Sequence, residues 1–173
     1  MPTIIVLASG RGERFVASGG QGNKLHALLE GKSILQHTLD AVIASGLPWH
    51  LEDAGHPGMG DSIAAGVRAT PLAAGWLILP GDLPLIQPQT LQAVAQALQA
   101  GAQAAYPSYQ GVRGHPVGFA AENALQLKNL EGNQGAALIL SALFAMKIVV
   151  DDVGCVTDID TLDELDAVRN RVR

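Results

Sequence analysis

The sequence predicts an α/β fold with three layers, in which helices cover both faces of a mostly parallel central sheet. Short apolar, β-branched runs such as 3–8 and 75–79 are typical of strands that helices bury on both faces. Between these runs, apolar residues recur at helical spacing, so strands and helices alternate along the chain. In folds of this class, ligands bind at the carboxyl ends of the strands.

Each further element follows one of these two periodicities. We expect additional strands at 103–107, 115–119 and 146–150, and helices at 33–43, 60–70, 88–100, 122–128, 133–145 and 162–172. Ser33 is a suitable N-cap for the first long helix. Thr161 and Glu164 have the spacing of a capping box at the start of the last helix.

Composition narrows the class of ligand. The chain has 173 residues, 48% of them hydrophobic, which suits one globular domain spanning 1–173. Its formal charge of −5 argues against a basic face that grips nucleic acid. No basic leader opens the chain, and no apolar run approaches the roughly 20 residues that cross a bilayer. With Cys155 as the single, buried cysteine, we expect a cytoplasmic protein that binds a small molecule.

A glycine-rich loop with cationic side chains follows the first strand. It contains Gly10, Arg11, Gly12 and Arg14, and the chain then reaches Lys24. Glycine lets main-chain N–H groups approach phosphate closely, and arginine and lysine supply positive charge beside a polyphosphate. The loop therefore indicates a phosphate site, although glycines in a tight strand-to-helix turn are the alternative.

Two well-known phosphate loops are excluded. The dinucleotide fingerprint G-x-G-x-x-G would need glycine where Phe15 stands, and the P-loop would need glycine at His26. The later segment 31–33 is therefore interpreted as a turn and a helix cap.

Acidic residues follow two of the expected strands. Asp82 comes directly after the strand 75–79, and Asp158 and Asp160 lie between the last strand and the last helix. A carboxylate opposite a polyphosphate indicates Mg²⁺, which prefers hard oxygen ligands. We expect Asp82 to hold the metal with Asp158 or Asp160, one of which could instead cap the helix or turn the chain. Asp151 and Asp152 are interpreted as solvated surface charges.

The first loop resembles the signature of nucleotidyltransferases with a glycosyltransferase-A-like, Rossmann-like fold. That signature is L-x-x-G-x-x-x-R followed by a lysine, and the loop of that family wraps a triphosphate. The resemblance implies catalytic roles for Arg14, Lys24 and Asp82. It also implies nucleotide contacts from Leu7, Ala8, Ser9, Gly10, Arg11, Gly12 and Lys24.

The segments LASGRGER, NKL, GMGDS, PGDLP, RGHPVGF and DIDT together look like the molybdenum cofactor cytidylyltransferases, over nearly the whole chain. In that branch CMP passes from CTP to the phosphorylated molybdopterin cofactor and pyrophosphate leaves. The resemblance implies Gly60, Asp61 and Ser62 near the base, and Arg113 and His115 near the acceptor. It also implies Mg²⁺ and transient contact with a molybdoenzyme or its chaperone. His115 could equally be a structural, hydrogen-bonded histidine.

Other functions remain open. The donor could be GTP, the acceptor could be a sugar or alcohol phosphate, and the chain could be a catalytically silent nucleotide-binding module. Only 46–55 separates the first long helix from the GMG segment, where the family usually has a strand, a helix and another strand. We therefore expect about one strand–helix unit to be missing. Retention of Arg14, Lys24 and Asp82 argues for an enzyme.

Overall fold

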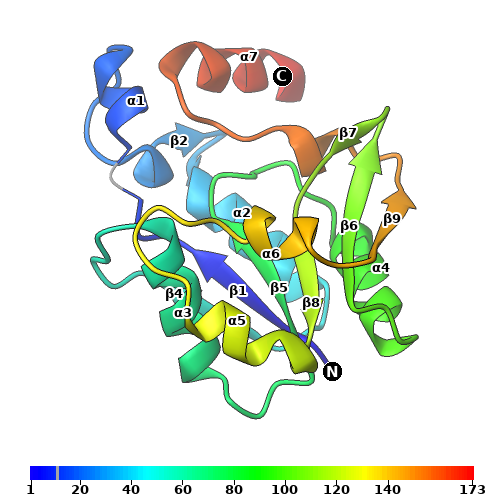
Figure 1. Cartoon of the computed structure of the whole chain (residues 1–173). Coiled ribbons are helices and arrows are strands. Elements are labelled where there is room, and N and C mark those ends of the chain that lie inside the picture. The colour runs from blue at the N-terminus through cyan, green and yellow to red at the C-terminus, as the bar shows by residue number, and fades with distance from the viewer. Residues whose placement is uncertain (11) are drawn as a thin grey trace.

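Seven strands form the central sheet in the part of the chain that the computed structural model describes, residues 1–10 and 12–173 (Figure 1). Their order is β4-β1-β5-β8-β6-β7, and β9 also pairs with β6. The strands are β1 (Thr3–Leu7), β4 (Trp49–Glu52), β5 (Gly75–Pro80), β6 (Ala104–Tyr109), β7 (Val112–Arg113), β8 (Val117–Ala120) and β9 (Ala145–Val149). Strands β7 and β8 run antiparallel to their neighbours and the other pairs are parallel, which confirms a mostly parallel sheet.

Helices cover both faces of this sheet. They are α1 (Glu13–Ala17), α2 (Ile34–Ala44), α3 (Met59–Ala69), α4 (Pro88–Gln99), α5 (Ala124–Lys128), α6 (Ala137–Ser141) and α7 (Leu162–Val172). Single 3₁₀ turns are η1 (Lys24–His26), η2 (Ala121–Asn123) and η3 (Val153–Val156), and β2 (Leu28–Leu29) pairs with β3 (Lys32–Ser33) as a separate hairpin.

Alternate residues of β1 show why three layers form. Ile4 joins a buried cluster with Val42 of α2 and Leu91 of α4, whereas the next residue, Ile5, joins a second cluster with Ile63 of α3. Because successive side chains of a strand point to opposite faces, an unbroken apolar run needs helices on both. The layered architecture follows from this run.

The expected helix ends are confirmed. The Ser33 side chain accepts a hydrogen bond from the Gln36 N–H at 3.1 Å, and α2 begins at the next residue. At α7, Thr161 accepts from the Glu164 N–H at 3.2 Å while the Glu164 carboxylate accepts from the Thr161 N–H at 2.9 Å. Both orphan donors of the capping box are therefore satisfied.

Two expectations about the second half of the chain are wrong. The helix expected at 133–145 is reduced to α6, because the residues before it bond to the start of α3: the Gly60 N–H donates to the Gly132 carbonyl at 2.9 Å. Asp152 is only 2% exposed rather than solvated. Its carboxylate accepts from the Thr90 hydroxyl at 2.6 Å and the Gly154 N–H at 2.9 Å, so it braces α4 against η3.

The expected missing unit corresponds to one edge of the sheet. Between α2 and α3 the chain contains the single strand β4, which pairs with β1 and ends the sheet on that side. Among the described helices, none combines the length and the apolar character needed to cross a bilayer.

Candidate active site

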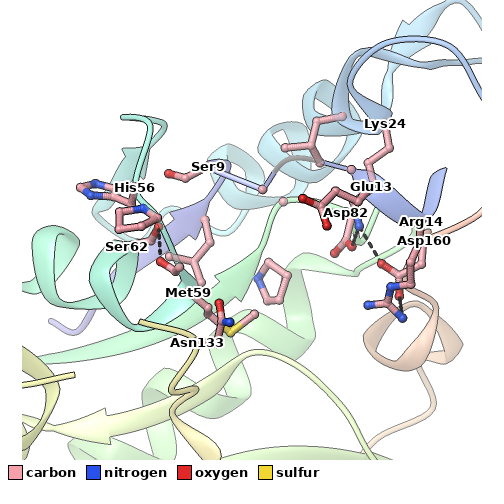
Figure 2. A pocket seen from close by; sticks show the side chains of 18 residues that line it. Ser9, Glu13, Arg14, Lys24, His56, Met59, Ser62, Asp82, Asn133 and Asp160 are labelled. Atoms are coloured by element: carbon pink, nitrogen blue, oxygen red, sulfur yellow. Dashed lines mark hydrogen bonds and ion pairs between the residues drawn. The ribbon is translucent and has the colours of Figure 1, made fainter. Parts of the chain in front are cut away.

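A cavity of about 480 Å³ opens where β1 and β5 end side by side (Figure 2). This volume is within the range of small-molecule sites, and the place is the one expected for ligands in an α/β sheet. Its walls come from six separate stretches of chain. The predicted residues that line it are Leu7, Ser9, Gly10, Gly12, Arg14, Lys24, Ser62, Asp82 and Asp160.

The turn after β5 places Asp82 at the floor of this cavity. The Gly81 N–H donates to the Leu7 carbonyl at 2.9 Å, and the Thr38 hydroxyl donates to the Gly81 carbonyl at 2.8 Å. A Cβ on Gly81 would lie 3.0 Å from the Leu7 oxygen and 3.0 Å from Leu35 Cδ1. Glycine therefore lets the ends of the two strands meet, and Asp82 follows at a fixed, 8% exposed position.

Lys24 joins the N-terminal part of the site to two acids far along the chain. Its Nζ lies 2.8 Å from Asp82 Oδ2 and 2.7 Å from Asp160 Oδ1. Arg14 adds a second cation, with Nη1 3.2 Å from Asp160 Oδ2 (Figure 2). The Arg14 side chain is 78% exposed, whereas that of Lys24 is 14% exposed. The buried ion pairs are therefore those of Lys24.

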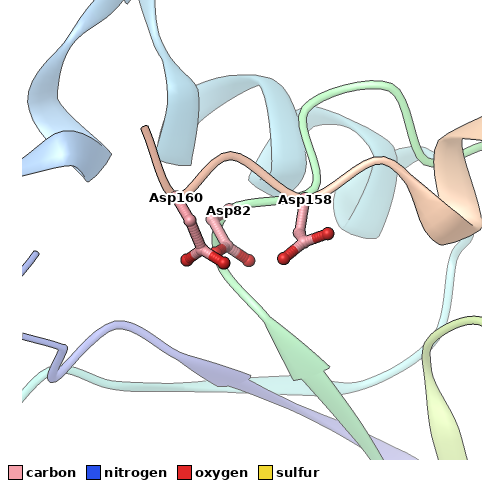
Figure 3. Close-up of side chains that lie close together, drawn as sticks. All are labelled: Asp82, Asp158 and Asp160. Atoms are coloured by element: carbon pink, nitrogen blue, oxygen red, sulfur yellow. The ribbon is translucent and has the colours of Figure 1, made fainter. Parts of the chain in front are cut away.

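Three carboxylates form a cluster beside this lysine (Figure 3). One oxygen each of Asp82, Asp158 and Asp160 lies within 4.8 Å of the others. The backbone N–H of Ile159 donates to the Asp82 carbonyl at 3.2 Å, which holds the last segment against the turn. Asp82 Oδ1 is buried with no hydrogen-bond partner among the described residues. Hard, partly unsatisfied oxygens at this spacing fit Mg²⁺ or Mn²⁺.

Charge and burial shift the pKa values of these groups in opposite directions. Burial together with the charges of Asp82 and Asp160 raises the pKa of Asp158. For Asp160, burial acts upward, but Lys24 and Arg14 outweigh it and lower the pKa. For Lys24, burial acts downward, but Asp82 and Asp160 outweigh it and raise the pKa. The lysine is therefore charged at neutral pH.

The glycine loop connects β1 to α1 along one wall. The Ala8 N–H and the Ser9 hydroxyl both donate to the Glu52 carbonyl, at 2.9 and 3.1 Å, which fixes the start of the loop to β4. A Cβ on Gly10 would meet no atom of the described residues beyond its chain neighbours within 4 Å. Gly12 has a φ of 64°, a conformation that favours glycine. Arg11, predicted as a nucleotide contact, lies outside the described residues.

The GMG segment forms the start of α3, and only part of it faces the cavity. Ser62 lines it. Gly60 is buried against the backbone of 131–134. The Asp61 carboxylate accepts from the Gly132 N–H at 3.1 Å and faces a second hollow of about 420 Å³.

The predicted acceptor residues lie outside the 480 Å³ cavity. Arg113 is exposed on β7, with its guanidinium carbon 6.0 Å from the centre of the Tyr106 ring. The backbone N–H of His115 donates to the Cys155 carbonyl at 2.9 Å. On the imidazole, Nδ1 is buried without a hydrogen-bond partner among the described residues. Burial lowers the pKa of His115, Arg113 adds to this, and Asp82 opposes it. Its surroundings therefore favour the neutral imidazole.

Some lining residues carried no usable signal in the sequence. Asn133 reaches the cavity from the segment expected to be helical, and only the fold brings it there. His56 also lines the cavity, and a buried acid holds its ring. The Glu52 carboxylate accepts from His56 Nε2 at 2.7 Å and from His50 Nε2 at 2.9 Å. Burial acts to raise the pKa of Glu52, but the two histidines outweigh it and lower the pKa. The alternation His50-x-Glu52 on one strand was available as a weak signal.

Solved structures share this fold over almost their whole length. Rv0371c from Mycobacterium tuberculosis H37Rv superposes with a TM-score of 0.82 at 21% identity, covering 97% of this chain and 96% of that one. Its complex with manganese gives 0.76 at 19%, covering 97% of each chain.

Two further solved structures, whose names refer to different nucleotides, also superpose. Molybdopterin-guanine dinucleotide biosynthesis protein A from Archaeoglobus fulgidus gives a TM-score of 0.72 at 18% identity, covering 98% of each chain. CMP:2-keto-3-deoxy-manno-octonic acid synthetase complexed with CTP gives 0.66 at 14%, covering 99% of this chain and 98% of that one. No curated protein sequence matches the chain.

The sheet, the glycine loop and the lysine–carboxylate cluster at the ends of β1 and β5 define an α/β protein with a charged candidate ligand site at that edge. Residues 41–147 match the family model of the MobA-like NTP transferase domain. The chain belongs to this family and is a MobA-like nucleotidyltransferase.

Proposed function

We propose that residues 1–173 act as one nucleotidyltransferase domain that transfers CMP from CTP to a phosphorylated acceptor, the molybdopterin cofactor, and releases pyrophosphate. The observation that carries this proposal is the contact of Lys24 with Asp82 and Asp160, at 2.8 and 2.7 Å, on the floor of the cavity that the glycine loop lines. The proposed phosphate-binding loop and two of the proposed metal ligands, Asp82 and Asp160, therefore line one cavity.

The triphosphate would lie along the loop that begins at Leu7, with Arg14 and Lys24 compensating its charge. The contacts proposed for it come from Leu7, Ala8, Ser9, Gly10, Arg11, Gly12 and Lys24. The nucleoside would extend toward the start of α3, where Gly60, Asp61 and Ser62 are placed near the base. Arg113 and His115 are proposed for the acceptor, and the unpartnered Nδ1 of His115 supports a polar contact there.

Mg²⁺ is the proposed cofactor, held by Asp82, Asp158 and Asp160. When bound, a divalent cation supplies positive charge between these carboxylates and the phosphates. The buried, unpartnered Asp82 Oδ1 supports this assignment within the chain. The manganese complex of Rv0371c, which has the same fold, supports it from outside.

In the proposed reaction an oxygen of the acceptor's phosphate attacks the α-phosphorus of CTP. A new P–O bond forms as the bond to the β-phosphate oxygen breaks, and pyrophosphate leaves with that electron pair. The attacking phosphate is already ionised near neutral pH, so no strong general base is needed. Arg14 and Lys24 would position the phosphates and stabilise the charge that develops on them.

The base and the acceptor are the least constrained parts of this proposal. A relative in fold is named for a guanine dinucleotide and another binds CTP, so GTP is the second candidate donor. A sugar or alcohol phosphate is the second candidate acceptor. Pyrophosphate release measured with each NTP and each acceptor distinguishes these possibilities, and NTP binding without product in any combination would indicate a silent module.

Replacing Asp82 tests the enzymatic proposal. We expect Asp82→Asn to lower pyrophosphate release from CTP and molybdopterin at least about 100-fold, because it removes a proposed metal ligand and a partner of Lys24. The matched control is Asp151→Asn, which removes an exposed carboxylate and should retain activity. Thermal unfolding checks that both variants fold. Undiminished turnover by folded Asp82→Asn would remove Asp82 from the mechanism.

A further inference from the structure

Lys24 occupies oxygens of two of the three carboxylates that are proposed to hold the metal. Its ammonium lies 2.8 Å from Asp82 Oδ2 and 2.7 Å from Asp160 Oδ1. All three side chains are at most 18% exposed, so water weakens these ion pairs little. The Lys24 ammonium therefore compensates part of the negative charge of the carboxylate cluster.

An ammonium group and a divalent cation at the same oxygens repel each other. Mg²⁺ lies about 2.0–2.1 Å from its oxygen ligands. A cation at that distance from Asp82 Oδ2 or Asp160 Oδ1 would share an oxygen with the Lys24 Nζ. Arg14 does not compete in this way, because its side chain is 78% exposed and, among the carboxylates of the described residues, it pairs with Asp160 alone, at 3.2 Å.

The lysine starts directly beside the phosphate-binding loop. A Cβ added to Gly12 would lie 3.4 Å from the Lys24 backbone nitrogen and 3.6 Å from its Cγ. The long, flexible side chain therefore leaves the backbone next to the loop and ends at the carboxylates. A triphosphate in the loop would offer the ammonium a second anionic partner within reach of the same stem.

We propose that Lys24 blocks binding of a divalent metal ion in the nucleotide-free protein by holding Asp82 and Asp160, so that the metal enters together with the triphosphate. This inference rests on the proposed function, which assigns the metal to these carboxylates and the triphosphate to the loop. The competing arrangement is a metal that binds through Asp82 Oδ1 and Asp158 while Lys24 stays in place, since Lys24 contacts neither.

The test is the affinity for Mn²⁺ alone, measured by electron paramagnetic resonance on protein without nucleotide or acceptor. We expect Lys24→Met to bind Mn²⁺ roughly tenfold more tightly than the wild type, a factor typical of coupled sites. Arg14→Met is the matched control, because it also removes one positive charge that pairs with Asp160. We expect its gain to be less than about twofold, since an exposed charge is screened.

Two results would overturn the proposal that Lys24 blocks metal binding. One is an unchanged Mn²⁺ affinity in Lys24→Met, which would mean that the metal and the lysine bind side by side. The other is an equal gain in Arg14→Met and Lys24→Met, which would mean that net charge alone sets the affinity. If Lys24→Met does not fold, Lys24→Gln removes the same charge with a polar side chain. Mn²⁺ affinity is measured without any transfer reaction. A failure of the proposed transferase activity is therefore distinguishable from a failure of the proposed competition between Lys24 and the metal.

Discussion

Asp158 and Asp160 lie two residues apart in one cluster, yet their surroundings favour opposite protonation states. Asp160 contacts Lys24 at 2.7 Å and Arg14 at 3.2 Å, and these cations lower its pKa against the effect of burial. Asp158 pairs with no cation among the described residues, and burial with two neighbouring carboxylates raises its pKa. One acid therefore stabilises the metal-free fold when ionised, and the other destabilises it.

This contrast predicts opposite stability changes in metal-free protein. A raised pKa in the folded state favours folding at low pH, and this contribution is lost as the pH rises through that pKa. The Tm of Asp158→Asn should therefore exceed that of the wild type by a margin that grows above about pH 4. A lowered pKa favours folding above the ordinary value of about 3.9, so Asp160→Asn should lower the Tm at neutral pH. Thermal unfolding with a chelator between pH 4 and 8 measures both. Shifts of the same sign in the two variants would contradict the assignment of cations.

At the scale of single residues, the sequence predicts which side chains belong to the site better than it predicts how buried each one is. Position after a strand predicted Asp82 together with Asp158 or Asp160 at one site, and the family resemblance placed Lys24 there. The structure brings Lys24 to Asp82 and Asp160. Asp152 shows the limit, because its burial depends on Thr90, 62 residues away, donating to its carboxylate. A charged side chain in a turn gives no local sign that such a partner exists.

At the scale of elements, the start of α3 and the segment 131–134 hold each other in place. A Cβ on Gly60 would lie 2.7 Å from the Gln134 oxygen and 2.8 Å from the Glu131 oxygen, both backbone atoms. A Cβ on Gly58 would collide with the backbone of Gly132. Glycine in the GMG segment therefore allows close packing that positions Ser62 at the cavity, whether or not it also approaches the nucleotide.

Gly60→Ala should therefore destabilise the protein by about 1–3 kcal/mol, because the backbone of the facing segment must move to admit the methyl group. The control is Gly135→Ala in the same region, where the new Cβ would meet only the Met59 sulfur, at 3.6 Å. That change should stay within about 0.5 kcal/mol of the wild type. Urea unfolding measures both values, and equal stability of the two variants would show that the segment moves without cost.

The elements that the sequence could predict are those with a repeated apolar pattern, and the contact between α3 and 131–134 explains one that it could not. Long helices and doubly buried strands were found because a repeated apolar pattern marks them, as in α2, α4 and β5. The helix expected at 133–145 failed because bonds to α3 hold residues before α6 in a loop, and Gly132 adopts a φ of 58°. The local sequence pattern likewise could not predict strand direction. Strand β8 is as apolar as the parallel strands of the sheet, yet it runs antiparallel to β5.

At the scale of the whole molecule, the segment 13–34 packs against the segment 159–172 beside the site. A third buried cluster joins Phe15 of α1, Leu25 of η1 and Leu165 of α7. Two hydrogen bonds fasten the same region: the Leu162 N–H donates to the Ser18 hydroxyl at 2.8 Å, and Arg169 donates to the Leu28 carbonyl at 2.9 Å. Figure 1 shows α7 lying beside α1 and β2. The elements that carry Arg14, Lys24 and Asp160 therefore share this small core, apart from the two larger ones.

This division predicts that two equally buried leucines differ in their effect on nucleotide binding. Leu165→Ala and Leu91→Ala should each cost about 2–5 kcal/mol in the free energy of unfolding, because the side chains are 1% and 0% exposed. Only Leu165→Ala should also raise the KM for CTP, roughly tenfold, because its cluster sets the position of the lysine and the acids. Leu91 packs in the cluster under α2 and α4 and lines no part of the cavity. Urea unfolding and steady-state pyrophosphate release measure the two quantities, and an equal rise in KM for both variants would show that general loosening of the fold, rather than this third core, controls the geometry of the site.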